Sequence, residues 1–245
     1  KNRYNHADMN HLEELLQKSN SNIKLIATDG VFSMDGVLAP LKDIVFLAKK
    51  YNALIMVDDC HATGFLGRTG RGSAEYHDVL DDIDIITSTF GKALGGASGG
   101  FISSSSEIIE TLRQKSRPYL FSNSLAPPLV AASIKVFDII SEDYSYKKKL
   151  EENTVYFRNQ IKSIGLDIKG EDHPIVPIMI YDAKKAVEMS EKLLEKGIYV
   201  IAFSFPVVPK DEARIRVQIS AAHSKEQIDN AINAFAEIAK ELNII

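Results

Sequence analysis

The 245-residue sequence has one cysteine, no excess of charge of one sign and no long apolar run. With Cys60 alone, the chain cannot form an internal disulfide framework or a zinc site built from several cysteines. Its 29 basic and 33 acidic residues are spread along the chain, so no basic stripe indicates a nucleic acid or an anionic membrane as partner. There is no apolar stretch of about 18 residues and no beginning typical of a signal peptide. We therefore expect a globular protein of the reducing cytoplasm.

Apolar runs alternate with a helical pattern in the first half of the chain. Residues 40–52 begin with proline and have the spacing of an amphipathic helix, and they connect strand-like runs at 23–30 and 53–59. Two further short strands are expected at 83–90 and 99–105. This alternation predicts a mostly parallel sheet covered by helices.

After Leu125, long helical patterns surround further strand candidates. Helices are expected near 125–142, 145–164, 183–196 and 224–241, and strands at 175–182, 198–203 and 214–220. We therefore predict an α/β protein in two parts. Residues 1–140 would form part of a large domain that contains the mostly parallel sheet, and residues 141–245 a smaller C-terminal α/β domain.

Polar residues follow three of the predicted strands at their carboxyl ends, where ligands bind in open α/β sheets. They are Asp29, Gly30 and Ser33 after the first strand, Asp58, Asp59 and His61 after the second, and Ser88, Thr89 and Lys92 after the third. Each residue alone has an ordinary structural explanation, such as an aspartate that caps a turn or a lysine on the surface. Their concentration at corresponding strand ends favours a binding or catalytic site.

The pair Gly91-Lys92, next to further glycines, suggests a phosphate-binding P-loop, but the spacing excludes it. The required glycine five positions earlier is Ile86, and the residue after the lysine is Ala93. The glycine-rich run at 95–100 precedes a strand instead of joining a strand to a helix, which excludes a dinucleotide fingerprint. The chain also lacks a G-x-S-x-G elbow and the ligand spacing of a zinc site, so we expect no metal.

A lysine next to small residues suits the formation of a Schiff base with an aldehyde cofactor. Burial of Lys92 would make its neutral amine available as a nucleophile and base. Pyridoxal phosphate also needs a carboxylate at its ring nitrogen and hydrogen-bond donors for its phosphate. An aspartate at a strand end meets the first need, and Ser88 and Thr89, just before the lysine, meet the second.

Four segments, in this order, resemble the α-oxoamine synthases, which are fold type I pyridoxal-phosphate enzymes. The segments are TDGVFSMDG at 28–36, VDDCHATGFLGRTGRG at 57–72, TSTFGKALGGASGG at 87–100 and RIRVQISAAHS at 214–224. The resemblance implies the fold type I architecture and covers essentially the whole chain. It also implies an upstream segment that supplies a phosphate-binding turn, a histidine stacked on the cofactor ring and part of the acyl-CoA channel. We therefore expect this chain to form an incomplete large domain and only part of the cofactor pocket.

The resemblance implies a role for each matching residue in the cofactor site. Lys92 carries the cofactor and moves the proton at the substrate α carbon. Asp58 pairs with the pyridine nitrogen, and His61 lies against the ring and its phenolic oxygen, with Ser33 nearby. Thr89 binds the phosphate.

Residues 112–140 resemble the family members that join glycine and acetyl-CoA to give 2-amino-3-oxobutanoate and CoA, or that catalyse the reverse in threonine breakdown. By the same resemblance, Arg216 binds the substrate carboxylate. Ser122 and Asn123 reach the cofactor of a neighbouring subunit, which predicts a homodimer. Family members that make 8-amino-7-oxononanoate, or another α-oxoamine synthase, are the first alternative. The second is a non-catalytic fragment with a structural or interaction role.

Overall fold

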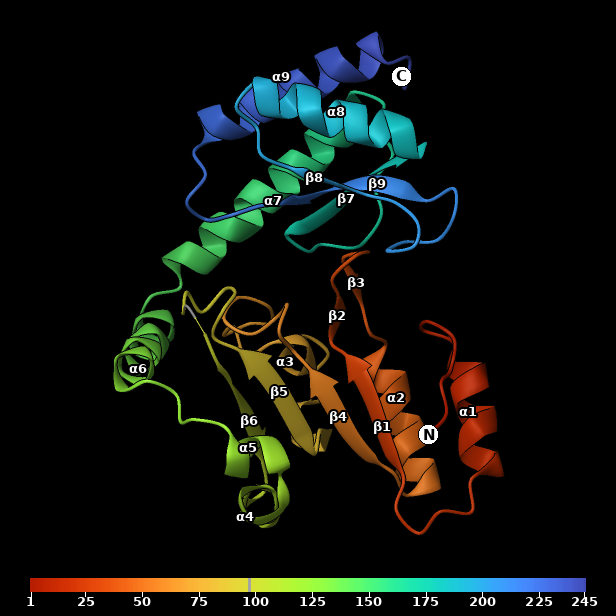
Figure 1. Cartoon of the computed structure of the whole chain (residues 1–245), viewed down its shortest axis with the longest axis vertical. Coiled ribbons are helices and arrows are strands. Elements are labelled where there is room, and N and C mark those ends of the chain that lie inside the picture. Colours follow the sequence, from red (N-terminus) through yellow and green to blue (C-terminus); the bar gives the residue numbers. More distant parts are fainter. Residues whose placement is uncertain (97) are drawn as a thin grey trace. The chain divides into compact units, whose positions relative to one another are not determined.

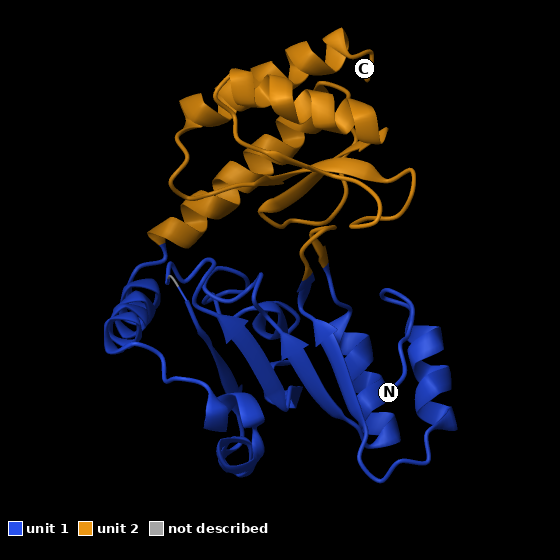
Figure 2. Cartoon of the chain, viewed as in Figure 1, with its two compact units in different colours: residues 1–31, 38–144 blue, residues 32–37, 145–245 orange. Residues whose placement is uncertain are grey.

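The computed structural model describes residues 1–96 and 98–245, and the chain divides into two compact units (Figure 2). Unit 1 comprises residues 1–31 and 38–144, and unit 2 comprises residues 32–37 and 145–245. Each unit contains its own sheet with helices packed on it. Within the described ranges, no helix has both the length and the apolar character needed to cross a membrane.

Unit 1 contains a four-stranded sheet (Figure 1). Its strands, in spatial order, are β1 (Leu25–Asp29), β4 (Leu54–Asp58), β5 (Ile85–Thr89) and β6 (Gly100–Ser104). β1, β4 and β5 are parallel, whereas β6 is antiparallel to β5. The β-branched and apolar residues of these segments suit a pleated, half-buried surface. The structure confirms the predicted α/β class and the strand-helix-strand unit.

Helix α2 (Leu41–Tyr51) forms the crossover from β1 to β4. Pro40 precedes its first turn, and Asn52 ends it in the left-handed conformation with φ of 50°. Helix α1 (Met9–Lys18) packs against α2 and begins after Asp8, whose carboxylate accepts a backbone hydrogen bond of the first turn. The apolar faces of both helices are buried, and α2 packs against β4 of the sheet.

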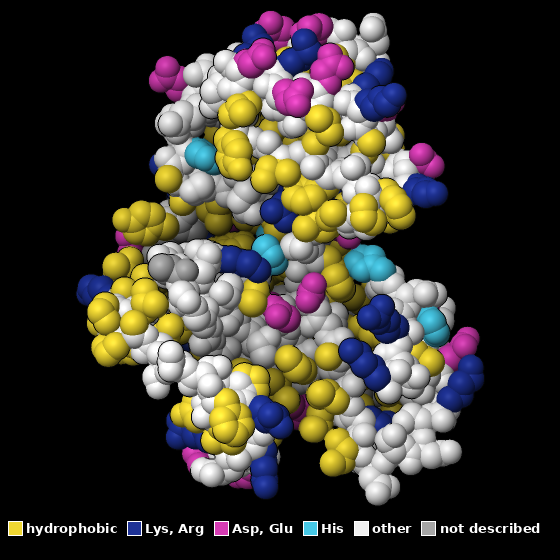
Figure 3. Space-filling model, in the orientation of Figure 1, with side chains coloured by type: hydrophobic (Ala, Val, Ile, Leu, Met, Phe, Trp, Pro, Cys, Tyr) yellow, Lys and Arg dark blue, Asp and Glu magenta, His cyan; other side chains and the backbone are white. Residues whose placement is uncertain are grey.

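Other helices in the described part of unit 1 are α3 (Ser73–Tyr76), η1 (Leu80–Asp82), α4 (Ser106–Lys115), α5 (Arg117–Phe121) and α6 (Pro127–Glu142). The sequence patterns predicted α6 but not α4 or α5. Neither α4 nor α5 buries a residue in the described structure. Figure 3 shows apolar side chains gathered over α6, where Ile134 is 58% exposed.

Unit 2 contains a three-stranded antiparallel sheet and three long helices. The strands, in spatial order, are β7 (Ile175–Tyr181), β9 (Ala213–Gln218) and β8 (Ile201–Phe203), and the helices are α7 (Ser145–Ser163), α8 (Ala183–Glu195) and α9 (Lys225–Glu241). α8 packs against all three strands, and α7 packs against α9. Phe157 and Phe235 meet edge to face in the core between these helices. All six elements were predicted from the sequence.

A short hairpin contributes residues 32–37 to unit 2, whereas its outer residues Val31 and Leu38 belong to unit 1. Its strands are β2 (Val31–Phe32) and β3 (Val37–Leu38), and they pair only with each other. Gly36 completes the turn with φ of 62°, a conformation that favours glycine. The sequence analysis did not predict this hairpin, because two-residue strands are too short to show a period.

Candidate active site

The carboxyl ends of β1, β4 and β5 lie side by side in unit 1. Asp29 on β1 and Asp58 on β4 are register partners, and Asp58 is in turn the partner of Thr87 on β5. Because the three strands are parallel, the segments that follow them leave from the same edge of the sheet. The structure thus brings Asp29 and Asp58 together, as the strand pattern led us to expect.

Lys92 and His61 meet at this edge. Lys92 lies between β5 and β6, and its Nζ is 2.9 Å from Nε2 of His61, which follows β4. An ammonium group donates a hydrogen bond to an imidazole nitrogen that carries no hydrogen, so the two side chains can share a proton between them. Lys92 is exposed and His61 is half-buried. The expected burial of Lys92 is therefore wrong for this structure, because the turn after β5 carries the amine out beyond the end of the strand.

Two carboxylates and the Lys92 amine interact electrostatically. Partial burial raises the pKa of Asp29, repulsion from Asp58 raises it further, and attraction to Lys92 opposes both. Asp58 accepts a hydrogen bond from the backbone N–H of Cys60 at 3.0 Å. Burial, together with a hydrogen bond to Asp58, raises the pKa of the Cys60 thiol to about 11. The raised pKa keeps Cys60 in the neutral thiol form at neutral pH, which is the less nucleophilic form.

A chain of hydroxyl groups connects the segments that carry these side chains. The buried Ser88 donates from Oγ to Oγ1 of Thr63 at 2.9 Å, and Thr63 donates to the carbonyl oxygen of Asp59 at 3.0 Å. The chain joins the end of β5, which leads to Lys92, to the turn that carries His61. The sequence suggested Ser88 as a phosphate donor, but in the structure its hydroxyl is committed to this internal contact.

The remaining predicted residues of unit 1 lie near the surface. Thr89 ends β5, donates from Oγ1 to the carbonyl oxygen of Gly99 at 3.1 Å and accepts from the N–H of Gly91 at 3.1 Å. Ser122 and Asn123 are exposed in the segment between α5 and α6. Their proposed contact with a neighbouring subunit stays a prediction.

Arg216 and Ser33 are in unit 2. Nη1 of Arg216 donates to the carbonyl oxygen of Ser33 at 3.2 Å, and the guanidinium lies over the ring of Phe203, 5.0 Å from its centroid. Burial lowers the pKa of Arg216. Within the described ranges, no carboxylate forms an ion pair with Arg216, so its planar guanidinium is available for an external carboxylate.

Asp59, one of the polar residues expected after the second strand, has a structural role inside the protein. It is fully buried and accepts hydrogen bonds from the Ser73 N–H at 2.9 Å and from Ser73 Oγ at 2.5 Å. A Cβ added at Gly30 or Gly72 would lie 2.1 or 1.8 Å from its carboxylate oxygens. These two glycines therefore leave the space that Asp59 occupies. The only sequence signal was the pair of aspartates, which does not reveal that the second one faces inward.

Asp59 makes the stability of the protein depend on pH. Burial raises its pKa to about 6, repulsion from Asp58 adds to this, and the hydrogen bonds from Ser73 oppose it. The folded protein thus binds a proton more tightly than the unfolded chain. Protonated Asp59 therefore stabilises the folded state. This contribution is fully present below the ordinary pKa of 3.8 and is lost as pH rises through the folded-state pKa of about 6. The shift corresponds to about 3 kcal/mol, at about 1.4 kcal/mol per unit.

We expect Asp59→Asn to remove this dependence, because asparagine does not titrate. Its oxygen can accept from the Ser73 N–H, and its amide can donate to Ser73 Oγ. Urea unfolding of both proteins between about pH 3 and about pH 7 measures the difference in their free energies of unfolding. Over this range the free energy of unfolding of the wild type should fall by about 3 kcal/mol relative to that of the variant. Groups that do not interact with Asp59 titrate alike in both proteins and cancel. A difference that stays constant would show that Asp59 does not titrate there.

Within the described residues, no group of three or more histidine, cysteine, aspartate or glutamate side chains is arranged to hold a metal ion. The amine, imidazole, carboxylate and hydroxyl groups described above match the requirements of a covalently bound aldehyde cofactor.

Known proteins similar to this chain agree with the interpretation of the site as one for an aldehyde cofactor. The family described as aminotransferase class I and II matches residues 1–235. The 2-amino-3-ketobutyrate coenzyme A ligase of Escherichia coli is 53% identical over 246 residues, which is 99% of this chain and 62% of that protein. The 8-amino-7-oxononanoate synthase of Petrotoga mobilis is 49% identical over 245 residues, again 99% of this chain and 62% of that protein.

A solved structure of the serine palmitoyltransferase of Sphingomonas wittichii has a TM-score of 0.94 at 31% identity, and the match covers 98% of this chain and 61% of that one. The chain thus spans about three fifths of the length of these relatives. The predicted fold type I architecture and the resemblance to acyl-CoA-dependent relatives are confirmed. The chain belongs to the aminotransferase class I and II family.

Proposed function

We propose that the carboxyl ends of β1, β4 and β5 bind pyridoxal 5'-phosphate. The groups that this cofactor requires are found together there: the amine of Lys92, the imidazole of His61 at 2.9 Å and the carboxylate of Asp58. A serine palmitoyltransferase structure with this cofactor has a TM-score of 0.94 to the chain. When bound, the cofactor supplies an electron-accepting ring that stabilises negative charge at the α carbon of an attached amino acid.

Each residue then has a role that its chemistry permits. Lys92 would hold the cofactor through its aldehyde and would take the proton from the substrate α carbon. Asp58 would accept a hydrogen bond from the ring nitrogen and so keep that nitrogen protonated. By the family resemblance, His61 would lie against the ring and Thr89 would bind the phosphate.

We further propose that the whole protein is a glycine C-acetyltransferase, also called 2-amino-3-ketobutyrate CoA ligase. The observation that carries this proposal is the 53% identity, over 99% of the chain, to the Escherichia coli protein of that name. Glycine loses its α proton to Lys92, and its α carbon attacks the carbonyl of acetyl-CoA. A carbon–carbon bond forms, the carbon–sulfur bond breaks, and CoA leaves. Arg216 holds the glycine carboxylate through this step.

The rival within the family is an 8-amino-7-oxononanoate synthase, because a relative of that name is 49% identical. We expect the protein expressed from its complete reading frame to release CoA from glycine and acetyl-CoA at least about tenfold faster than from alanine and a pimeloyl thioester. A coupled thiol assay with each substrate pair measures this ratio. Exclusive use of the second pair would reject the acetyltransferase proposal in favour of its rival.

We propose a homodimer as the active assembly. The exposed apolar side chains on α5 and α6, among them Phe121 at 79% and Ile134 at 58% exposure, favour a second copy as the partner that covers them. Ser122 and Asn123 lie between these two helices, so a partner docked there would approach both side chains. This is consistent with the role in a neighbouring subunit's site that the family resemblance implies.

A further inference from the structure

Strand β9 carries two arginines, Arg214 and Arg216, whose surroundings differ. Because they are two residues apart on one strand, they lie on the same face of the sheet. We propose that Arg214 and Asp35 are positioning residues that hold Arg216 in the orientation needed to bind a carboxylate. The proposal rests on the proposed role of Arg216 toward the amino-acid substrate, and all the contacts that support it lie within unit 2.

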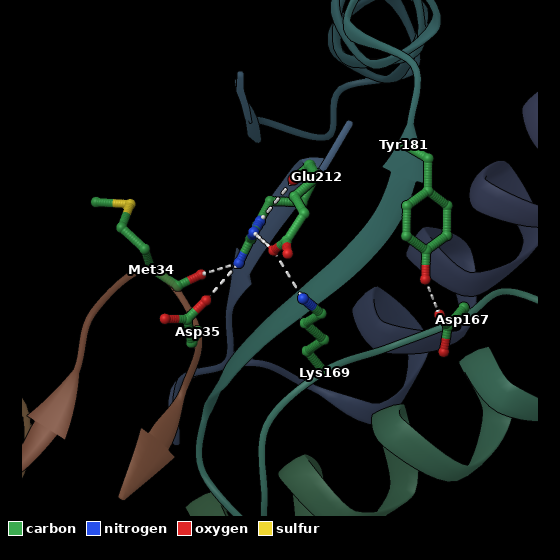
Figure 4. A network of polar contacts seen from close by, with 7 residues as sticks. Met34, Asp35, Asp167, Lys169, Tyr181 and Glu212 are labelled. Carbon is green, nitrogen blue, oxygen red and sulfur yellow. Dashed lines mark hydrogen bonds and ion pairs between the residues drawn. The ribbon is translucent and has the colours of Figure 1, made fainter. Parts of the chain in front are cut away.

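The charge of Arg214 is used entirely within the protein. Its side chain is 1% exposed, and its Nη1 donates to the Asp35 carboxylate at 2.5 Å and to the Met34 carbonyl oxygen at 3.2 Å (Figure 4). Nη2 donates to the Glu212 carboxylate at 2.8 Å, and Nε donates to the Glu212 carbonyl oxygen at 3.0 Å. Lys169 also pairs with Glu212, at 2.7 Å. Arg214 therefore anchors the hairpin turn and has no capacity for an external anion.

Close backbone contacts fix the same turn. A Cβ added at Gly36 would lie 2.6 Å from the carbonyl oxygen of Ile175, and one added at Gly170 would lie 2.6 Å from the carbonyl oxygen of Asp35. Gly170 is itself held by the buried Arg158, which donates to its carbonyl oxygen at 2.5 Å. Because Gly36 and Gly170 have no side chains, the backbone of the turn can pack directly against the backbone of the rest of unit 2.

Arg216 depends on this turn for its orientation. Its hydrogen bond to the carbonyl oxygen of Ser33, at 3.2 Å, joins it to the same short segment that Asp35 ties to Arg214. Two arginines thus hold one turn from two neighbouring points on β9. Loss of Asp35 would let the turn shift, and the Ser33 carbonyl would no longer fix the guanidinium of Arg216.

The orientation matters because a guanidinium binds both oxygens of a carboxylate only when its plane faces them. A displaced Arg216 would still carry its charge but would form fewer well-aligned hydrogen bonds. We therefore expect a loss that is specific to ligands with a carboxylate. A general loosening of the fold would instead weaken the binding of every ligand.

The test compares glycine with methylamine, which is glycine without its carboxylate. Four variants are prepared in the cofactor-loaded protein that is expressed from the complete reading frame. They are Asp35→Ala, Asp35→Asn, Arg216→Gln and the control Glu188→Ala. Glu188 is an exposed carboxylate on α8, 4.0 Å from Lys192. Changes in the absorbance of the cofactor on titration give a dissociation constant for each amine, and urea unfolding reports whether each variant is folded.

We expect Asp35→Ala to weaken glycine binding about tenfold to a hundredfold and to leave methylamine binding unchanged. Asp35→Asn keeps an oxygen that can accept from Arg214 and should fall between Asp35→Ala and the wild type, and it serves as the test if the alanine variant does not fold. The control should match the wild type for both amines.

Each other outcome has a definite meaning. If Asp35→Ala binds glycine as tightly as the wild type while Arg216→Gln does not, the positioning role is wrong and the role of Arg216 stands. Equal weakening for glycine and methylamine would reduce Asp35 to a structural residue and also overturn the inference. If Arg216→Gln binds glycine normally, the proposed function of Arg216 fails, and the positioning role fails with it.

Discussion

Lys92→Ala is expected to abolish covalent attachment of pyridoxal phosphate and to lower the rate of the reaction by about a thousandfold or more. The variant loses both the amine that forms the bond to the cofactor aldehyde and the group that moves the α proton. Since Lys92 is exposed and the described hydrogen bond of its side chain is the one with His61, its removal should leave the fold intact. The expected loss is therefore chemical and not structural.

The measurement is incubation with pyridoxal phosphate, reduction with borohydride and peptide mass analysis. The wild type should carry the reduced cofactor on Lys92, and the variant should carry none at a stoichiometric level. Lys42→Ala, which removes an exposed lysine of α2, is the matched control and should be labelled like the wild type. Labelling of the Lys92→Ala variant at another site would contradict the assignment. A folded wild type without label would favour the non-catalytic alternative.

Gly72→Ala is expected to lower the free energy of unfolding by about 3 to 5 kcal/mol, the largest effect on stability that we anticipate. Gly72 has φ of 102° and ψ of −163°, a region open only to glycine. Its new Cβ would also lie 1.8 Å from the buried carboxylate of Asp59. Backbone strain and steric overlap therefore act together.

Two further glycines separate these causes. Gly30→Ala adds only the overlap, because its Cβ would lie 2.1 Å from Asp59 and its φ is not positive, and we expect a loss of about 1 to 3 kcal/mol. Gly95→Ala adds only the strain, since φ is 69° and no described atom lies within 4 Å of its Cβ, and we expect about 1 kcal/mol. Urea unfolding of the three variants measures the losses. If Gly72→Ala and Gly95→Ala lower the free energy of unfolding equally, the side chain of Asp59 moves away from the new methyl group without a measurable cost.

Local sequence patterns identified most of the framework of the candidate site. The strands that end at Asp29, Asp58 and Thr89 were visible as short apolar runs, and their parallel order follows from the helix between the first two. Once the order is known, the meeting of Asp29 and Asp58 is a matter of register. Strand ends are therefore the part of such a site that a single sequence reveals best.

Contacts between distant residues were not visible in the sequence. Asp59 and Ser73 are 14 positions apart, and Arg214 and Asp35 are 179 positions apart, so no local period relates either pair. The exposure of Lys92 was missed for a similar reason, since the depth of a side chain depends on what covers the strand end. The roles of the predicted site residues remain predictions until the variants above are measured.

The hairpin at 32–37 also decides how the chain can be divided. Because this hairpin belongs to unit 2, the chain passes between the two units after residues 31, 37 and 144. A single cut after Tyr144 would separate residues 145–245 from Asp35 and leave the buried Arg214 with only one of its two carboxylate partners. Unit 2 is therefore not a transferable module. Insertions, deletions or fusions in this protein have to preserve all three points at which the chain passes from one unit to the other.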